Sequence, residues 1–243
     1  MEKQHIHPID KSRISQTFDG ISGSYDIVNR LISFGFDRNW RTKLISYIPD
    51  DNGLRVLDLA TGTADVAIRA IKSKSNIAGV VGVDLSEKMM EIGKKKAEAA
   101  GFSDKVTFKK GDLLSLPFDE NTFDCVTMAF GLRNAADTAK CISEISRVLK
   151  EGGRALVLEF SLPKNFLFRS AYLFYFKYIL PIAAGAISGN MKAYRYLTST
   201  VVGFPPPEKI AAMMENAGLE VETVSLSLGI VTIYIATKGI KKG

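Results

Sequence analysis

The stretch that decides the fold is Arg55-Val-Leu-Asp-Leu-Ala-Thr-Gly-Thr-Ala-Asp65. Its first five residues are a short apolar run of the β type, and a loop of small residues then leads into a helical pattern over Ala64–Ile71. A strand, a tight loop and a helix N-terminus together form a ligand cradle at the carboxyl edge of a parallel sheet. Small residues let the backbone approach the ligand, and the helix offers free N–H groups to it. The stretch therefore predicts an α/β fold with a ligand site directly after its first strand.

Strands and helices alternate along the chain that follows. The predicted helix over Glu87–Ala100 has Ser86 as its N-cap and Gly101 just past its end. Alternation at this spacing predicts a parallel sheet covered by helices. The other elements predicted in this region are strands over Val80–Asp84, Val106–Lys109, Phe123–Ala129 and Ala155–Phe160, and a helix over Ala139–Leu149.

The end of the chain breaks this pattern. A predicted helix over Pro207–Ala217 is followed by two apolar runs, Val221–Leu226 and Ile230–Thr237, with Gly229 between them. Two strands joined so closely must form an antiparallel hairpin. A doubly wound, mostly parallel seven-stranded sheet that ends in such a hairpin is the Rossmann-like architecture of class I methyltransferases. Because a fold does not fix a function, the site has to decide the chemistry.

The length of the chain and the distribution of its apolar and basic residues predict the domain organisation. A chain of 243 residues suits a single domain over residues 1–243. Residues 1–50 form a predicted N-terminal helical segment, because apolar residues over Ile14–Ile48 fall at the spacing of two or three short helices. Residues 162–206 form a predicted helical lid insertion that is both apolar and basic.

The composition is that of an ordinary globular protein, with 46% hydrophobic residues, 24% charged residues and a formal net charge of +6. This basic balance permits contact with nucleic acid, anionic lipid or acidic ligands and requires none of them. Cys125 and Cys141 lie in apolar runs without metal-site spacing, and His5 and His7 are the only histidines, so we expect no metal centre. The first residues lack the apolar run of a signal peptide, which favours a cytoplasmic location with reduced thiols.

Two kinds of cofactor compete for the loop after the first strand. The dinucleotide fingerprint needs three glycines, whereas this loop supplies Gly62 alone. Asp58, just before the loop, suits the cationic end of a ligand such as an α-amino group or a sulfonium. Asp84 closes the second strand, where an acid accepts hydrogen bonds from both ribose hydroxyls. Dinucleotides and S-adenosylmethionine share the ribose contact, so Asp84 does not separate them.

The end of the third strand distinguishes S-adenosylmethionine from a dinucleotide as the cofactor. Asp112 ends this strand, where an acid can accept from an adenine amino group, and the apolar side chain beside it, Leu113, can cover the ring face. Each aspartate taken alone could serve only as a cap or a turn residue. Acids at three successive strand ends are much harder to explain in that way, and they predict S-adenosylmethionine as the cofactor.

Three further stretches resemble one family closely. They are Tyr25–Gly35 running on to Trp40, the run Ala129-Phe-Gly-Leu-Arg-Asn134, and Arg147–Arg154 running on to Ser161. Together they resemble the ubiquinone and menaquinone biosynthesis C-methyltransferases, and the resemblance extends from Phe18 to about Ala236. It implies methylation of a ring carbon of a prenylated quinol, either a naphthoquinol or a benzoquinol. We expect demethylmenaquinol as the acceptor, because it is the more widespread of the two. The resemblance also implies cofactor contacts at Thr63, Asp84, Asp112, Leu113 and Ala129.

The chain departs from the family pattern at four positions. The family usually has methionine where Val28 stands, histidine where Asp37 stands, glycine where Ala64 stands and proline where Glu151 stands. The change at Asp37 matters most, because it can remove a polar group near the substrate. The change at Ala64 adds one methyl group to the cofactor loop, and it leaves open a binding subunit without catalytic activity.

The chemistry places demands on the residues after the fourth strand. A ring carbon is a weak nucleophile until the neighbouring phenol loses its proton, so the protein should stabilise a phenolate and relay a proton. Arg133 and Asn134 lie where open α/β sheets bind ligands, and Tyr25 lies in the N-terminal helices that can close over the site. Arg133 is a fixed cation and a poor base, so a water beside it is the better proton acceptor. The alternatives are an ion pair of Arg133 with Asp137 or Glu159, and plain packing of Tyr25.

The predicted lid has an unusual composition. The stretch Phe160–Pro207 contains no acidic residue, and Phe166–Ile187 within it is strongly apolar, although Pro181 and two cations interrupt it and argue against a spanning helix. Aromatic side chains beside cations suit a membrane interface or a pocket for the prenyl chain. The alternatives are a lid buried against the domain and a contact in a homodimer. The cations of the stretch are Lys164, Arg169, Lys177, Lys192 and Arg195.

Other functions fit the sequence less well. A methyltransferase for another apolar phenol would not need the stretch from Tyr25 to Trp40. A nucleic-acid methyltransferase is permitted by the net charge, yet the chain carries no recognisable nucleic-acid-binding module. The predicted partners are therefore a prenylated quinol and the inner surface of the cell membrane, and no nucleic acid is expected.

Overall fold

The computed structural model of the chain describes residues 19–23 and 25–240. Its centre is a seven-stranded sheet in the order β3-β2-β1-β4-β5-β7-β6. Neighbouring strands from β3 to β5 pair in parallel, whereas β7 is antiparallel to both β5 and β6. The predicted fold class, hairpin included, is confirmed. The strands are β1 (Leu54–Leu59), β2 (Ile77–Asp84), β3 (Val106–Lys110), β4 (Phe123–Ala129), β5 (Leu149–Phe160), β6 (Leu219–Leu226) and β7 (Val231–Lys238).

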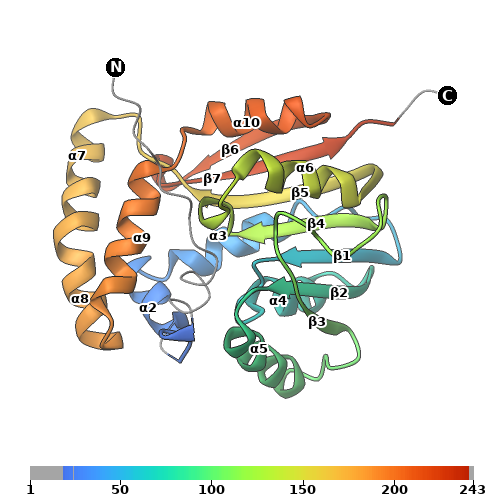
Figure 1. Ribbon diagram of the computed structural model, residues 1–243, viewed down its shortest axis with the longest axis horizontal. Coiled ribbons are helices and arrows are strands. Elements are labelled where there is room, and N and C mark those ends of the chain that lie inside the picture. Colours follow the sequence, from blue (N-terminus) through green and yellow to red (C-terminus); the bar gives the residue numbers. More distant parts are fainter. Residues whose placement is uncertain (1–18, 24, 241–243) are drawn as a thin grey trace.

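Helices cover both faces of the sheet (Figure 1). Side chains alternate between faces along a strand, so Val56 of β1 packs on one face and Leu57 on the other. The helices over the Val56 face are α3 (Phe36–Ile45), α4 (Asp65–Ser73) and α5 (Glu87–Ala99). Those over the Leu57 face are α6 (Thr138–Val148) and α10 (Pro207–Asn216).

The predicted start of one helix is confirmed, and the predicted start of one strand is not. Ser86 caps α5 as predicted, because its Oγ accepts the Met89 N–H at 3.1 Å. The fifth strand was predicted to start at Ala155, and this start is wrong. β5 begins at Leu149, which pairs with Phe123 of β4. The pairing register then shifts, because the next paired residues are Cys125 and Arg154, so β5 has extra residues at this point.

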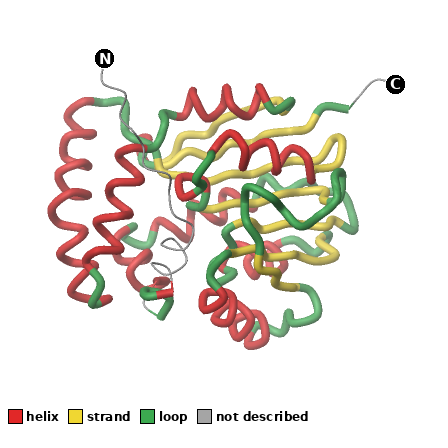
Figure 2. The backbone as a smooth tube through the Cα atoms, viewed as in Figure 1, coloured by secondary structure: helices red, strands yellow, loops and turns green. Residues whose placement is uncertain are grey.

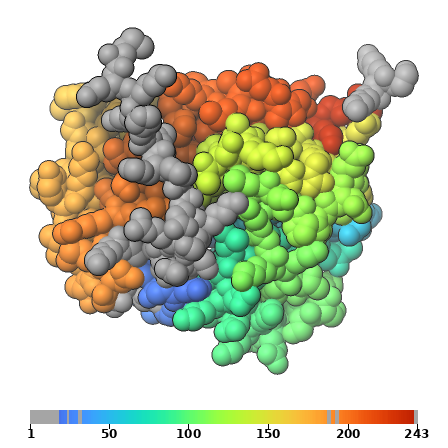
Figure 3. Space-filling model, in the orientation of Figure 1, coloured from blue at the N-terminus to red at the C-terminus, as the bar shows by residue number. Residues whose placement is uncertain are grey.

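A group of helices stands beyond the strand ends toward which β1 and β4 point (Figures 1 and 2). Figure 3 shows part of it, in yellow and orange, as one flank of the molecule. These helices have a hydrophobic cluster of their own, which includes Val28, Tyr172 and Phe176. We call α7 to α9 the lid. The elements are α2 (Tyr25–Ile32), α7 (Phe166–Phe174), the π-helical turn η2 (Tyr175–Ile179), α8 (Leu180–Ser188) and α9 (Met191–Gly203).

The lid helix passes Pro181 without stopping. Proline lacks an N–H and clashes with the carbonyl four residues earlier in an α-helix. The π turn at Tyr175–Ile179 precedes Pro181, and there the Leu180 N–H bonds to the Tyr175 carbonyl, five residues back. Among residues 19–23 and 25–240, no helix is both long and apolar enough to cross a membrane. Of the predicted N-terminal helices, α2 and α3 are present, and any element over residues 14–18 lies outside the described residues.

Candidate active site

The loop after β1 has a backbone conformation that most residues avoid. Ala60, Gly62 and Ala64 have positive φ angles of 49°, 53° and 64°. For each alanine this left-handed backbone costs about 1–2 kcal/mol, so the surrounding structure must hold it. The β4 side crowds the loop as well, because a Cβ on Gly131 would lie 2.5 Å from the Cβ of Ala60. The loop is therefore tightly wrapped at the strand ends, as a ligand cradle requires.

The methyl group of Ala64 does not fill the ligand space. Ala64 is fully buried and belongs to the wall of none of the three cavities described below. Its Cβ faces α5, where a Cβ on Gly93 would lie 3.1 Å from it. The departure at this position therefore strains the backbone without blocking the cradle.

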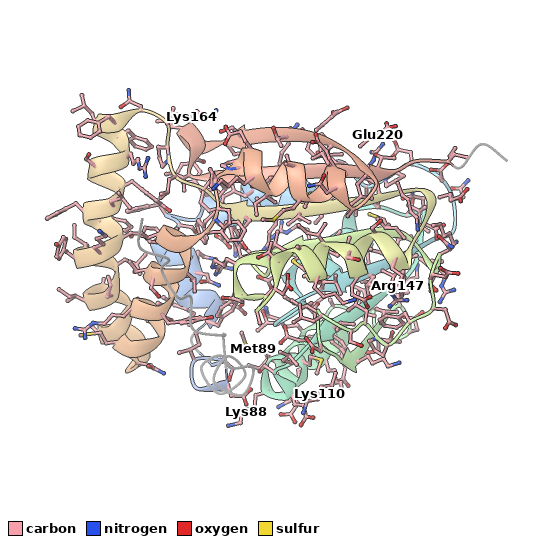
Figure 4. The ribbon with its side chains drawn as sticks, turned by 45° about the horizontal axis from the view of Figure 1, so that its top comes forward. Lys88, Met89, Lys110, Arg147, Lys164 and Glu220 are labelled. Carbon is pink, nitrogen blue, oxygen red and sulfur yellow. The ribbon has the colours of Figure 1, made fainter. Side chains whose placement is uncertain are left out.

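Asp84 ties the first two strand ends together. Its Oδ2 accepts the Gly62 N–H at 2.8 Å, and its Oδ1 accepts the Ser86 N–H at 2.9 Å. Burial raises the pKa of this carboxyl, and the backbone donors partly offset that rise. With Gly62, Leu85 and Met89, Asp84 lines a small cavity of about 70 Å³, which we call the cofactor cavity. Figure 4 labels Met89, at the start of α5.

The third strand end contributes to the same cavity. Gly111 and Leu113 lie in its wall, as does Ala129 at the end of β4. Asp112 lies beside the wall, and its Oδ1 accepts the Leu114 N–H at 3.0 Å. Leu85 and Met89 were not among the predicted residues. Their positions directly after Asp84 and in the first turn of α5 were the available signal.

Asp58 lies beneath the loop and is almost fully buried. Its two oxygens accept hydrogen bonds of 2.6 Å from Thr127 Oγ1 and Thr61 Oγ1. Burial raises the pKa of Asp58 to about 6, against the lowering effect of these two donors. Together with Thr63 and Arg41 it lines a second recess of about 20 Å³. A carboxylate in this position can attract the cationic end of a ligand.

A polar cluster fastens α2 to the cofactor loop. Thr63 Oγ1 donates to Asp26 Oδ1 at 2.8 Å, and Lys96 Nζ lies 2.6 Å from both Asp26 Oδ2 and Asp65 Oδ1. The Thr63 side chain is thus engaged with α2. Because Tyr25 adjoins Asp26, the cluster also positions Tyr25, which lies in the walls of the cofactor cavity, the second recess and the large cavity described next.

A third cavity, much larger than the other two at about 430 Å³, lies between the strand ends and the lid. Tyr25, Phe130 and Asn134 line both this cavity and the cofactor cavity, so the two are contiguous. We call it the aromatic cavity. Its aromatic lining consists of Tyr25, Phe34, Phe36, Trp40, Phe130, Phe160, Phe168, Tyr172, Tyr175, Phe176, Tyr194 and Tyr196.

Arg133 belongs to this wall and makes one of the two ion pairs that the sequence left open. Its Nη1 lies 2.7 Å from Glu159 Oε1 and donates to the Phe130 carbonyl at 2.6 Å, and its backbone N–H donates to Glu159 Oε2. Glu159 is fully buried. The other candidate partner, Asp137, caps α6. Pairing and cavity lining coexist, because Nη1 supplies only two of the five guanidinium donors.

A second charged group in the wall includes Asp37, the departure that was expected to remove a polar group near the substrate. Asp37 Oδ2 lies 2.7 Å from Arg41 Nη1, and Asp37 Oδ1 accepts from Ser33 Oγ at 3.0 Å. The Arg41 guanidinium lies over the Phe130 ring, 5.4 Å from its centre. Asp37 is the single acid among the described residues of this wall. The departure at Asp37 therefore places a buried ion pair, rather than an apolar surface, beside the aromatic cavity.

The sheet order, the terminal hairpin and the strand-end cradle define a class I methyltransferase, the class that takes its methyl group from S-adenosylmethionine. A model of the ubiE/COQ5 methyltransferase family matches residues 7–238, and the chain belongs to that family. The sequence-based expectations for fold, enzyme class and cofactor are thereby confirmed.

Two relatives illustrate the match. The Ubiquinone/menaquinone biosynthesis C-methyltransferase UbiE of Geobacter sulfurreducens is 42% identical over 230 residues, which cover 94% of this chain and 90% of the relative. The Demethylmenaquinone methyltransferase of Thermus thermophilus is 44% identical over 221 residues, which cover 91% of this chain and 99% of the relative.

Solved structures share the fold at much lower identity. A SAM-dependent methyltransferase from Aquifex aeolicus superposes with a TM-score of 0.57 at 20% identity, over 94% of this chain and 98% of that one. The [4+2]-cyclase SpnF superposes with a TM-score of 0.68 at 17% identity, over 95% and 97% of the two chains. Because one of these neighbours is a cyclase, the fold by itself leaves the reaction open.

Proposed function

We propose that the chain methylates a ring carbon of a prenylated quinol, with demethylmenaquinol as the first candidate acceptor. The observation that carries this proposal is the continuity of the aromatic cavity with the cofactor cavity through Tyr25, Phe130 and Asn134. A flat aromatic ring suits such a lining, and the relatives named above carry quinone biosynthesis in their names.

The strand-end residues fit the cofactor. We assign Asp84 to the ribose hydroxyls, Leu113 to the adenine face, and Asp58 with the Gly62 loop to the cationic amino acid end. The strained loop and the buried carboxylates form a cradle whose donor and acceptor set matches those groups. When bound, the cofactor supplies an electrophilic methyl group. Asp112, which lies beside the cavity wall, is assigned to the adenine amino group, and Thr63 and Ala129 to backbone contacts around the cradle.

The remaining residues prepare the acceptor. The donors of Arg133 not used by Glu159 stabilise the phenolate oxygen, and a water beside Arg133 takes the phenol proton. Asn134 and Tyr25 position the ring at the junction of the two cavities. Burial raises the pKa of Tyr25, against the influence of Arg41 and Arg133, so its hydroxyl stays protonated and serves as a donor. The aromatic wall keeps water from the reacting atoms.

The experiment that tests this proposal is mass spectrometry of membrane quinones after deletion of the gene. A quinone one methyl group short should accumulate, and the intact gene should restore the normal mass. Naphthoquinone or benzoquinone as the accumulating species would identify the acceptor. An unchanged quinone profile would refute the proposal.

We also propose that the outer face of the lid contacts an anionic membrane. Four apolar side chains along α7, η2 and α8 are between 59% and 77% exposed, and Arg169 and Lys177 on the same helix are exposed too. Such a surface suits the interface of a bilayer in which a prenylated quinol dissolves. Lys164 pairs with Glu208 at 2.7 Å, and the side chain of Lys192 lies outside the described residues. The four apolar side chains are Leu167, Phe174, Tyr178 and Ile182.

A further inference from the structure

The Tyr172 hydroxyl and Arg133 Nε lie in the wall of the aromatic cavity and are buried. Neither of these donors has a hydrogen-bond partner in the described part of the chain. Tyr172 is only 7% exposed. Unpartnered buried donors are rare in folded proteins, and at a cavity wall they indicate a missing acceptor.

The two donors come from different parts of the fold. Tyr172 lies in α7 of the lid, and its ring packs against Phe176 with centroids 4.6 Å apart. Arg133 follows β4 on the sheet and is held by Glu159. The Arg133 guanidinium lies over the Phe160 ring, 5.2 Å from its centre. The Phe160 ring centre is 5.9 Å from that of Phe176, on which Tyr172 packs. Both donors therefore border the same group of aromatic rings in the cavity wall.

Neither group supplies the missing acceptor for the other. Burial raises the pKa of Tyr172 far above its ordinary value, so the hydroxyl keeps its proton. Its oxygen can accept as well as donate, but it makes no hydrogen bond with Arg133 Nε among the described residues. A guanidinium has donors alone. The ligand between them must therefore bring an oxygen that accepts hydrogen bonds, and a negatively charged oxygen suits the arginine best.

We propose that Tyr172 and Arg133 together bind one ring oxygen of the aromatic substrate, with Tyr172 donating a hydrogen bond to that oxygen. The inference rests on the proposed function, and it adds a substrate-binding residue from the lid. Tyr172 does not take the substrate proton, because it remains protonated throughout. The oxygen-binding site is complete only when the lid packs on the sheet.

The test uses Tyr172→Phe in the full chain, with Tyr234→Phe as a matched control. Tyr234 of β7 is also fully buried with an unpartnered hydroxyl, but it lines none of the three cavities. Both changes keep the ring and remove only a hydroxyl. Because neither hydroxyl has a hydrogen-bond partner among the described residues, both variants should melt at or above the wild-type temperature.

The probes are 1,4-dihydroxynaphthalene, kept reduced, and 1,4-dimethylnaphthalene, which has the same shape without oxygen. Calorimetry should show that the wild type and Tyr234→Phe prefer the oxygenated probe by about tenfold. In Tyr172→Phe that preference should largely vanish, while affinity for the cofactor stays unchanged. An equal preference in all three proteins would overturn the inference.

This binding measurement separates the inference from the proposed function. If the wild type does not methylate a quinol and still shows the Tyr172-dependent preference for oxygen, the proposed function fails and the oxygen site stands. If the wild type methylates a quinol and Tyr172→Phe keeps both the preference and the full rate, the oxygen site fails and the proposed function stands.

Discussion

The cofactor cradle and the aromatic cavity satisfy their polar groups in opposite ways. In the cradle, Asp84 already holds two backbone N–H groups, and Asp58 holds two threonine hydroxyls. In the cavity, the Tyr172 hydroxyl and Arg133 Nε are buried without an acceptor among the residues that the structure describes. The cradle is therefore preorganised by the protein alone, whereas the polar part of the cavity is completed by its ligand.

The two regions also differ in where their residues come from. The cradle uses strand ends that are neighbours in one sheet. The cavity combines α2, α3, the end of β4 and the lid, so its shape depends on how the lid packs. Changes in the cradle should alter cofactor affinity, and changes in the cavity should alter turnover.

The largest effect is expected at Arg133. Arg133→Ala should lower kcat by about 10²-fold or more, because phenolate stabilisation is lost. It should also destabilise the fold by about 3–5 kcal/mol, because Glu159 is left as an unpaired buried charge. Steady-state kinetics and thermal melting measure the two effects.

A matched variant separates these effects. Arg133→Lys retains the charge opposite Glu159 but loses the planar donor set. It should fold much as the wild type does and still turn over at least about tenfold more slowly. Wild-type kcat in Arg133→Lys would show that the guanidinium donors do not act on the substrate.

In the cradle, Asp84→Ala should raise the dissociation constant of S-adenosylmethionine at least about tenfold, since hydrogen bonds to a charged acceptor contribute roughly 1.5–3 kcal/mol. Asp84→Asn keeps one acceptor oxygen and should lose less affinity. Isothermal titration with both variants measures the difference. Wild-type affinity in the alanine variant would remove Asp84 from the cofactor site.

Asp58 gives the cradle a pH dependence. Its pKa of about 6 in the folded protein exceeds the unfolded value, so its contribution to stability is lost as pH rises through about 6. The ionised form attracts the cationic end of the cofactor, so affinity should improve about tenfold between pH 5 and pH 7. Asp58→Asn should flatten this slope in titration calorimetry. The same slope in both proteins would assign the pH dependence to another group.

The sequence revealed the cradle well because its signals are local. A short β run, a small-residue loop and acids at successive strand ends are all legible along the chain, and a parallel sheet brings them to one edge. The residues of the aromatic cavity could be predicted from the sequence only in part. Arg133, Asn134 and Tyr25 lie in its wall, and their catalytic roles stay predictions. Asp37 was singled out only as a departure from the family pattern, whereas Tyr172 and Arg41 were missed.

The missed residues have a common physical cause. Tyr172 lies in an apolar run whose side chains could face the lid core, the cavity or solvent, and only tertiary packing decides among these. The π turn shifts the helical phase in the middle of that run, so simple periodicity could not sort its faces. Tertiary packing also decides whether Arg133 pairs with Asp137 or with Glu159, so the sequence could not choose between these two partners.

The smallest effect is expected on the outer face of the lid. Phe174→Ser combined with Tyr178→Ser should weaken binding to anionic vesicles severalfold at low salt, because both side chains are mostly exposed. Turnover of long-chain quinols should fall with it, and turnover of a short-chain analogue should not. Vesicle flotation at low and high salt, together with kinetics, measures this.

The inner face supplies the control. Tyr175→Ser changes a residue of the cavity wall on the same helix, so it should slow both substrates and leave vesicle binding intact. Equal losses on both substrates in the outer-face variant would mean that the lid is only structural. If the wild type fails to bind vesicles and its molar mass in solution doubles as the protein concentration is raised, that result would identify the outer face as a homodimer contact instead.

The most direct test of the account is methyl transfer by the purified chain to a short-chain demethylnaphthoquinol, followed by mass spectrometry with labelled S-adenosylmethionine. The reduced quinol should gain one labelled methyl group on a ring carbon and the oxidised quinone should gain none, because only the quinol yields a phenolate beside Arg133. Labelling of an oxygen instead of a carbon, or equal labelling of quinol and quinone, would contradict the account.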